Sequence, residues 1–331
     1  MRLSQGPATT DSPSVPTRRQ LRYARVRDFG AQVMAKIPVG ATIAHAYRFA
    51  FGDFVTIFRS IWLPLAVQLG LTLVLMQRLI PLFQALKTKD PSAISQLGPI
   101  LLLYPIVLIL FFAQIATVTK IALKPRQDIP IIDFPFGKDM WRLLGGFIAA
   151  GLAIVAMLLL FALAGGVLGF LLGAMGVGKT MLALLVGLLI AIGYGGTIFM
   201  VFRLTFLLAP VNIAEQRLGL GRAWELSRRN FWRSFAIVLS IMIPMIIAEY
   251  AVIFAAVGLP PMPHGEGPQA FQARRMEWNI AMMQSMVHYW YIALPLLALL
   301  MVLFIGTYCS AQVFAYRSLT EGESSAPIAT D

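Results

Sequence analysis

The sequence has very few of the residues from which catalytic and metal sites are built. It contains one cysteine, Cys309, and three histidines among 331 residues. A single thiol excludes a disulfide framework and a cysteine-ligated zinc cluster, and the histidines are too dispersed for a zinc site. No two carboxylates share a long apolar run, and no nucleophile–base–acid set can be assembled. The sequence therefore predicts no enzymatic activity, no cofactor and no metal site.

Charged residues are also scarce. They make up 13% of the chain against 58% hydrophobic residues, and the mean hydropathy is +0.76. Six apolar runs reach the roughly 20 residues that a membrane-spanning helix needs. Such runs satisfy their backbone polar groups in lipid only as helices. We expect an all-α integral membrane protein whose domain, residues 38–318, has six transmembrane helices in three hairpins, at about 61–83, 98–119, 143–172, 180–202, 235–259 and 289–316.

Acidic residues are rarer than basic ones, with 15 Asp and Glu against 27 Lys and Arg and a net charge of +12. If the N-terminus is cytoplasmic, 21 of the 27 basic residues fall on the cytoplasmic side of the six spans. This bias is the positive-inside rule, and it places both termini in the cytoplasm. The charge therefore gives no reason to invoke a nucleic-acid partner.

The two ends of the chain lack apolar periodicity. Residues 1–37 are rich in Ser, Thr, Pro and Arg, which is typical of a disordered basic cytoplasmic arm. The start has no apolar stretch of the kind found in cleavable secretory signals, although its Arg-rich composition also fits a mitochondrial transit peptide. Residues 319–331 are expected to form a short polar cytoplasmic tail.

Two segments repeat each other before apolar runs. Residues 46–58 and 223–235 share Ala, an aromatic residue, Asp or Asn, and two Phe at identical offsets, and residues 136–144 are a weaker echo. The three segments suggest three units, each of one interfacial helix followed by a helical hairpin. Each of the first two has an apolar stripe opposite a polar one, which predicts an amphipathic helix lying on the cytoplasmic surface of the membrane. Basic and aromatic residues of these helices are candidates for binding lipid headgroups: Arg48, Arg59, Arg222, Arg228, Arg229, Arg233 and Trp232.

Residues 173–180, GAMGVGKT, match the spacing of a phosphate-binding P-loop. A working P-loop needs a strand before it and an amphipathic helix after it, whereas both flanks here are apolar runs. We interpret the match as a false positive and expect no nucleotide partner. Gly165, Gly169 and Gly173 recur every fourth residue and are expected to form a face for close helix packing.

Of the polar residues in or beside the apolar runs, four are site candidates: Glu249, Arg203, Gln68 and Gln114. An intramembrane carboxylate such as Glu249 suggests a proton relay or a cation ligand. The alternative is a protonated Glu bonded to another span, or one that stays wet near the outer face. Gln68 and Gln114 are expected to hydrogen-bond across the first hairpin. Arg203 is interpreted as an interfacial anchor.

Methionines and two histidines gather in the outer segment between the fifth and sixth runs. Met262, Met282, Met283 and Met286 lie near His264 and His288. Thioether and imidazole groups would select Cu(I). The interpretation we favour is that the methionines fill space against lipid, because no thiolate, acidic cluster or tight repeat supports a copper site.

The stretch from 203 to 235 resembles the most recognisable block of bacterial multi-span proteins similar to the membrane domain of glycerophosphodiester phosphodiesterases. The matching residues are Arg203, Pro210, Glu215, Ala223, Ser227, Asn230, Phe231 and Trp232. In that family the membrane part accompanies a separate soluble hydrolase domain, and many members consist of the membrane part alone. The chain has no room for a hydrolase barrel of about 250 residues, so it resembles the stand-alone type.

Together these features predict a non-catalytic, multi-pass protein of the bacterial inner membrane. Its expected partners are membrane lipids, or another membrane or envelope protein, which it contacts through the basic amphipathic helices. The alternative is a secondary transporter or channel subunit that uses Glu249.

Overall fold

The computed structural model of the chain describes residues 36–88, 93–124, 136–176, 178–258, 261 and 267–324. Throughout these residues the regular structure is helical, and no strand is present. Six helices are long and apolar enough to cross a membrane, which confirms the all-α class and the number of predicted spans. Most of the predicted N-terminal arm, residues 1–35, and the last residues, 325–331, lie outside this description.

Ten helices are defined within these residues. They are α2 (Val39–Gly52), α3 (Phe54–Thr88), α4 (Ala93–Leu123), α5 (Lys138–Ala174), α6 (Lys179–Thr205), α7 (Leu208–Ala214), α8 (Leu220–Ser227), α9 (Phe231–Val257), α10 (Pro268–His288) and α11 (Trp290–Ser324).

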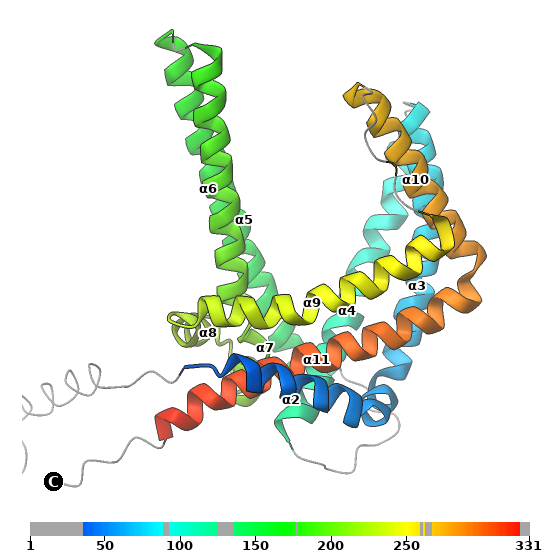
Figure 1. Cartoon of the computed structure of the whole chain (residues 1–331), viewed down its shortest axis with the longest axis vertical. Helices are drawn as coiled ribbons and strands as arrows, with labels where there is room; N and C mark the ends of the chain where they lie inside the picture. The colour runs from blue at the N-terminus through cyan, green and yellow to red at the C-terminus, as the bar shows by residue number, and fades with distance from the viewer. Residues whose placement is uncertain are drawn as a thin grey trace, which may run out of the picture.

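Two of the expected hairpins are plain in Figure 1, where α3 pairs with α4 and α5 pairs with α6. The third pair is less simple. Helices α9 and α11 contact each other and run obliquely across the molecule, but α10 follows α9 and packs along α3 before the chain turns at Tyr289 into α11. Between the last two spans, Pro268–His288 therefore form a helix that lies against the bundle.

The core of the protein lies at one end of the helices, which we name the basic end because it carries Lys120, Arg142 and Arg317. Lys120 Nζ and Arg142 Nη1 lie 2.9 Å and 3.2 Å from the two carboxylate oxygens of Asp139, which joins α4 to α5. Arg317 donates a hydrogen bond to the carbonyl of Leu123 at the end of α4. Basic residues that the sequence assigns to one side of the membrane are thus brought together by the fold.

Helix α7 is the centre of this core. Five consecutive residues from α6 to α7, 206–210, are buried, and they contact both large apolar clusters of the protein. Pro210 explains the break before α7, because its ring would clash with the carbonyl of Phe206 in a continuous helix. Pro210 lies instead in the first turn of α7, where a missing N–H costs little.

The predicted amphipathic helix at 46–58 is not one helix. It breaks at Asp53, so that Phe54 and Phe58 belong to the membrane helix α3. The face of α2 that packs against the protein carries Thr42, Ala46 and Ala50, all small, whereas Phe51 is 63% exposed. Small residues allow the close approach of α2 to α11, where a Cβ on Gly306 would lie 3.4 Å from Ala50 Cβ. The second segment breaks in the same way, between α8 and α9.

Three other expectations need correction. The echo at 136–144 lies mainly within the first turns of α5 and makes no separate helix. Ile37, assigned to the arm, is fully buried and belongs to the core. At the other end, α11 continues to Ser324 and Leu319 is 5% exposed, because it packs in the same core cluster. The packed core therefore extends past both ends of the range 38–318, to Ile37 and Leu319.

The P-loop-like residues 173–180 form the connection between α5 and α6. Helix α5 ends at Ala174, Gly176 has φ +72°, and α6 begins at Lys179. Both flanks are membrane-spanning helices, so the strand that a P-loop requires is absent at this place. The expected glycine face is correct only in part, because a Cβ on Gly165 would lie 2.8 Å from Leu189, whereas Gly169 and Gly173 have open space beside them.

Candidate functional site

The residues that carry the resemblance meet at the basic end. Arg203 lies in the last turn of α6. Its carbonyl accepts a hydrogen bond of 2.8 Å from Ser227 Oγ in α8. Ala223, one turn before Ser227, is fully buried against the core. Trp224 places its ring under the Arg203 guanidinium, with 3.6 Å between Cζ and the ring centroid. The spacing in this block thus positions α8 across the end of α6.

Asn212 fixes the turn between α7 and α8. Its side chain is fully buried, its Oδ1 accepts a hydrogen bond of 2.7 Å from Gly219 N, and its Nδ2 donates to the carbonyl of Arg142 at 3.4 Å. A Cβ on Gly219 would lie 2.2 Å from Val211, so only glycine fits beside α7. Asn212 is not among the residues predicted from the sequence, although an amide within the apolar stretch 204–213 is the same signal that identified Gln68 and Gln114.

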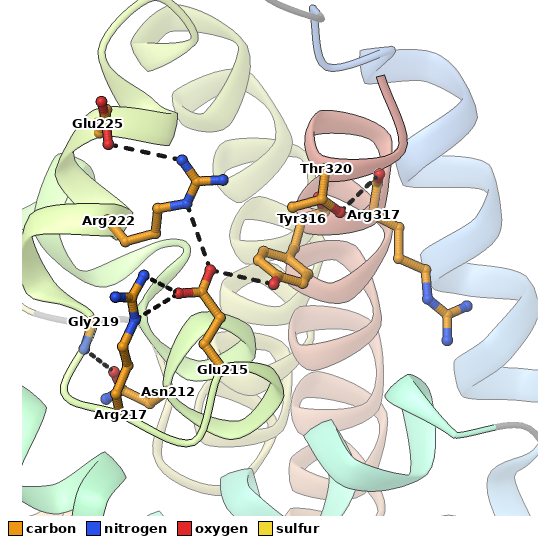
Figure 2. A network of polar contacts seen from close by, with 9 residues as sticks. All are labelled: Asn212, Glu215, Arg217, Gly219, Arg222, Glu225, Tyr316, Arg317 and Thr320. Atoms are coloured by element: carbon orange, nitrogen blue, oxygen red, sulfur yellow. Dashed lines mark hydrogen bonds and ion pairs between the residues drawn. The ribbon is translucent and has the colours of Figure 1, made fainter. Parts of the chain in front are cut away.

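Glu215 is the acidic centre of the network in Figure 2. Its Oε2 accepts hydrogen bonds from Arg217 Nε at 2.8 Å and Nη2 at 2.6 Å, while Arg222 Nε lies 3.5 Å from Oε1. Tyr316 of α11 donates its hydroxyl to Oε1 at 3.4 Å. Arg222 also faces Glu225, at 3.7 Å. Through these contacts Glu215 ties the α7–α8 turn to α11.

Asn230 and Arg233 hold the chain that enters α2. Asn230 Oδ1 accepts a hydrogen bond of 3.2 Å from Ile37 N, and Arg233 Nη1 donates to Ile37 O at 2.9 Å. Two of the predicted lipid-binding arginines, Arg222 and Arg233, are therefore occupied by contacts within the protein.

A second group of cations has no such partners among the residues that the structure describes. Arg228 and Arg229 are exposed in the turn before α9, and Trp232, three residues beyond, is 76% exposed. The guanidinium of Arg228 lies near enough to that of Arg203 for the two positive charges to repel each other. Among the described residues, no acidic side chain pairs with any of these three arginines. We name Arg203, Arg228, Arg229 and Trp232 the arginine corner.

Aromatic rings hold the arginine corner together. Phe199 of α6 lies 6.5 Å from Trp224 and 4.7 Å from Phe231, measured between ring centroids, and Phe231 contacts Trp232 at 5.1 Å. Arg203 lies over this cluster, and its Nε is buried without a hydrogen-bond partner in the described part of the chain. The cation is therefore fixed in position, and no acidic side chain within the described ranges forms an ion pair with it. Phosphate and carboxylate groups are the ligands that such a planar guanidinium binds best.

The remaining predicted headgroup contacts, Arg48 and Arg59, lie on the side of α2 and α3 and are exposed. Arg48 is near His45, which stacks on Phe314 with 4.7 Å between ring centroids. Burial, together with the charges of Arg317 and Arg48, lowers the pKa of the His45 imidazole below its usual value of 6.5. His45 is therefore neutral at pH 7, and the positive charge on this side comes from the arginines.

The intramembrane candidates have different surroundings. Gln114 Nε2 donates a hydrogen bond of 2.5 Å to Gln68 Oε1 across the α3–α4 hairpin, as the sequence predicts. Glu249 is exposed on α9, and within the described residues it forms no hydrogen bond to another span. It lines neither the groove between α3 and α10 nor the groove between α3 and α11.

Residues that could ligate a metal do not converge within the described ranges, where no three His, Cys, Asp or Glu side chains form a group. Met262 and His264 lie outside these ranges, and Met283 is buried in the contacts of α10. Comparisons with protein-family models, with curated proteins and with solved structures found no match to this chain.

Proposed function

We propose that the protein is a non-catalytic module of the bacterial inner membrane that binds the headgroups of anionic lipids at its cytoplasmic face. The arginine corner carries this proposal. Arg203 is held on Trp224 with no acidic partner among the described residues, and Arg228 adds a second positive charge nearby. Two neighbouring cations at a membrane boundary need a counterion, and the phosphates of anionic lipids lie at that depth.

The chemistry of the corner fits a lipid better than a soluble anion. Trp232 is largely exposed beside the arginines, and indole rings favour the headgroup layer of a membrane. Helices α6 and α9, which supply the corner, are membrane-spanning, so its depth is set by their apolar lengths. The resemblance to a membrane domain that accompanies lipid-related hydrolases agrees with this assignment, and a partner protein that carries an acidic segment is the competing ligand.

Reversal of the two exposed arginines tests the proposal. We expect Arg228→Glu with Arg229→Glu to weaken binding of fluorescent phosphatidylglycerol about tenfold or more, because each basic residue near an anionic surface contributes about 1 kcal/mol. Binding is measured on the purified protein in neutral detergent at low salt, with phosphatidylcholine as the neutral probe.

The matched control reverses Arg78 and Arg275, which are exposed on α3 and α10 away from the corner. This control has the same net charge as the corner variant and should keep the wild-type affinity. An equal loss of phosphatidylglycerol affinity in both variants would assign the binding to net charge alone. Unchanged affinity in the corner variant would reject the arginine corner as the binding site.

A further inference from the structure

An apolar groove runs between α3 and α11 and has a volume of about 370 Å³. Its walls include Phe58, Trp62 and Ala66 from α3 and Trp290, Tyr291 and Ala298 from α11. The four aromatic side chains are between 39% and 58% exposed, although they lie between two helices that contact each other. Both helices are membrane-spanning, so the groove opens toward lipid.

The break at Tyr289 accounts for the groove. Helix α10 ends at His288, and α11 starts in a new direction at Trp290, which brings Trp290 and Tyr291 beside the first half of α3. Ala66 and Ala298 leave the space between the rings unfilled, and the buried Leu65 forms part of its floor. Phe58 and Leu69 are eleven residues apart, which is about 16 Å along the helix.

A charge marks one end of the groove. Arg59 precedes Trp62 by three residues and Ala66 by seven, so all three lie on the same face of α3. Arg59 is exposed, and no ion pair within the described ranges involves it. A molecule with a hydrocarbon tail and an anionic head could place its tail in the apolar groove and its head against Arg59.

The lining of the groove and the charge at its end decide between two kinds of occupant. A helix from a partner or a second copy would cover the apolar walls without bringing an anion to Arg59. An anionic phospholipid brings both a hydrocarbon chain for the walls and a phosphate for the guanidinium. We propose that the groove binds one acyl chain of an anionic phospholipid whose headgroup is held by Arg59. This site is separate from the arginine corner and does not depend on it.

The groove is tested with phosphatidylglycerol that carries a diazirine on its acyl chain. The full-length protein is reconstituted in liposomes with this probe, irradiated and digested, and the labelled peptides are identified by mass spectrometry. We expect labelling within 58–69 and 290–298 that excess unlabelled phosphatidylglycerol removes and excess phosphatidylcholine does not. Equal competition by the two lipids would overturn the proposal.

Two variants sharpen the test. Ala66→Trp fills the groove at an exposed position, and we expect it to reduce this labelling about tenfold. The control Val67→Trp adds the same ring to the next residue, which is 46% exposed and does not line the groove, and it should leave labelling unchanged. Persistent labelling in Ala66→Trp, or equal loss in Val67→Trp, would reject the groove as the site.

The headgroup contact has its own outcome. Arg59→Glu should weaken competition by phosphatidylglycerol about fivefold, and phosphatidylcholine should remain without effect in this variant. The variant with Arg228→Glu and Arg229→Glu should label the groove as the wild type does. If that variant lost the groove labelling, the groove would not be a separate site, whereas failure at the corner alone leaves this proposal standing.

Discussion

Gly146→Ala is expected to lower the free energy of unfolding by about 2–4 kcal/mol. The added Cβ would lie 2.4 Å from Asn212 Nδ2, a distance that no real contact tolerates. Movement of Asn212 would be costly, because its side-chain amide forms hydrogen bonds with Gly219 N and with the carbonyl of Arg142 in the buried core. The loss combines overpacking with disrupted buried hydrogen bonds, and it is measured by denaturant titration of the purified protein in detergent.

Gly145→Ala is the matched control. It makes the same substitution one residue earlier in α5, but its Cβ would lie 3.7 Å from Leu218, an ordinary contact. Alanine is a better helix residue than glycine, so this variant should be unchanged or up to about 1 kcal/mol more stable. Similar stabilities for the two variants would mean that Asn212 does not hold the α7–α8 turn.

Gly306→Leu is expected to cost about 2–3 kcal/mol and to loosen α2 from the bundle. A Cβ at this position would lie 3.0 Å from Ile57 Cδ1 and 3.4 Å from Ala50 Cβ, with the Ala50 backbone directly behind. The remaining leucine atoms have no space unless α2 shifts. Denaturant titration gives the stability, and faster tryptic cleavage after Arg48 reports the release of α2.

Gly70→Leu on α3 serves as the control for this substitution, because nothing lies within 4 Å of its added Cβ. It should retain wild-type stability within about 0.5 kcal/mol, as exposed substitutions usually do. Destabilisation of both variants by the same amount would show that the cost comes from the helix and not from the α2 contact.

The six spans could be predicted because a long apolar run can satisfy its backbone hydrogen bonds in lipid only as a helix. The helix breaks before Phe54 and Phe231 were missed, although the sequence carries a signal for them. Asp53 and Asn230 occupy the same offset in the two repeats, and both residue types favour helix boundaries over helix interiors. The apolar periodicity continues through these positions, so it predicted one helix where the chain forms two.

The candidate site could be predicted only as a set of basic residues. The identity of the unpaired arginines depends on contacts between residues distant in sequence. Arg233 donates a hydrogen bond to the carbonyl of Ile37. Arg222 lies beside the Glu215 carboxylate, which Tyr316 also contacts. The exposure of Glu249 likewise depends on which face α9 turns to its neighbours, and a single carboxylate in an apolar run carries no information about that face.

The arginine corner is tested most directly by a cryo-EM structure of the protein in nanodiscs that contain phosphatidylglycerol. We expect headgroup phosphate density in contact with the Arg203 guanidinium, at about 2.7–2.9 Å from its nitrogens. Arg228 should contact the same phosphate. Ordered lipid elsewhere on the protein with none at the corner, or an acidic residue of the chain paired with Arg203, would contradict this expectation.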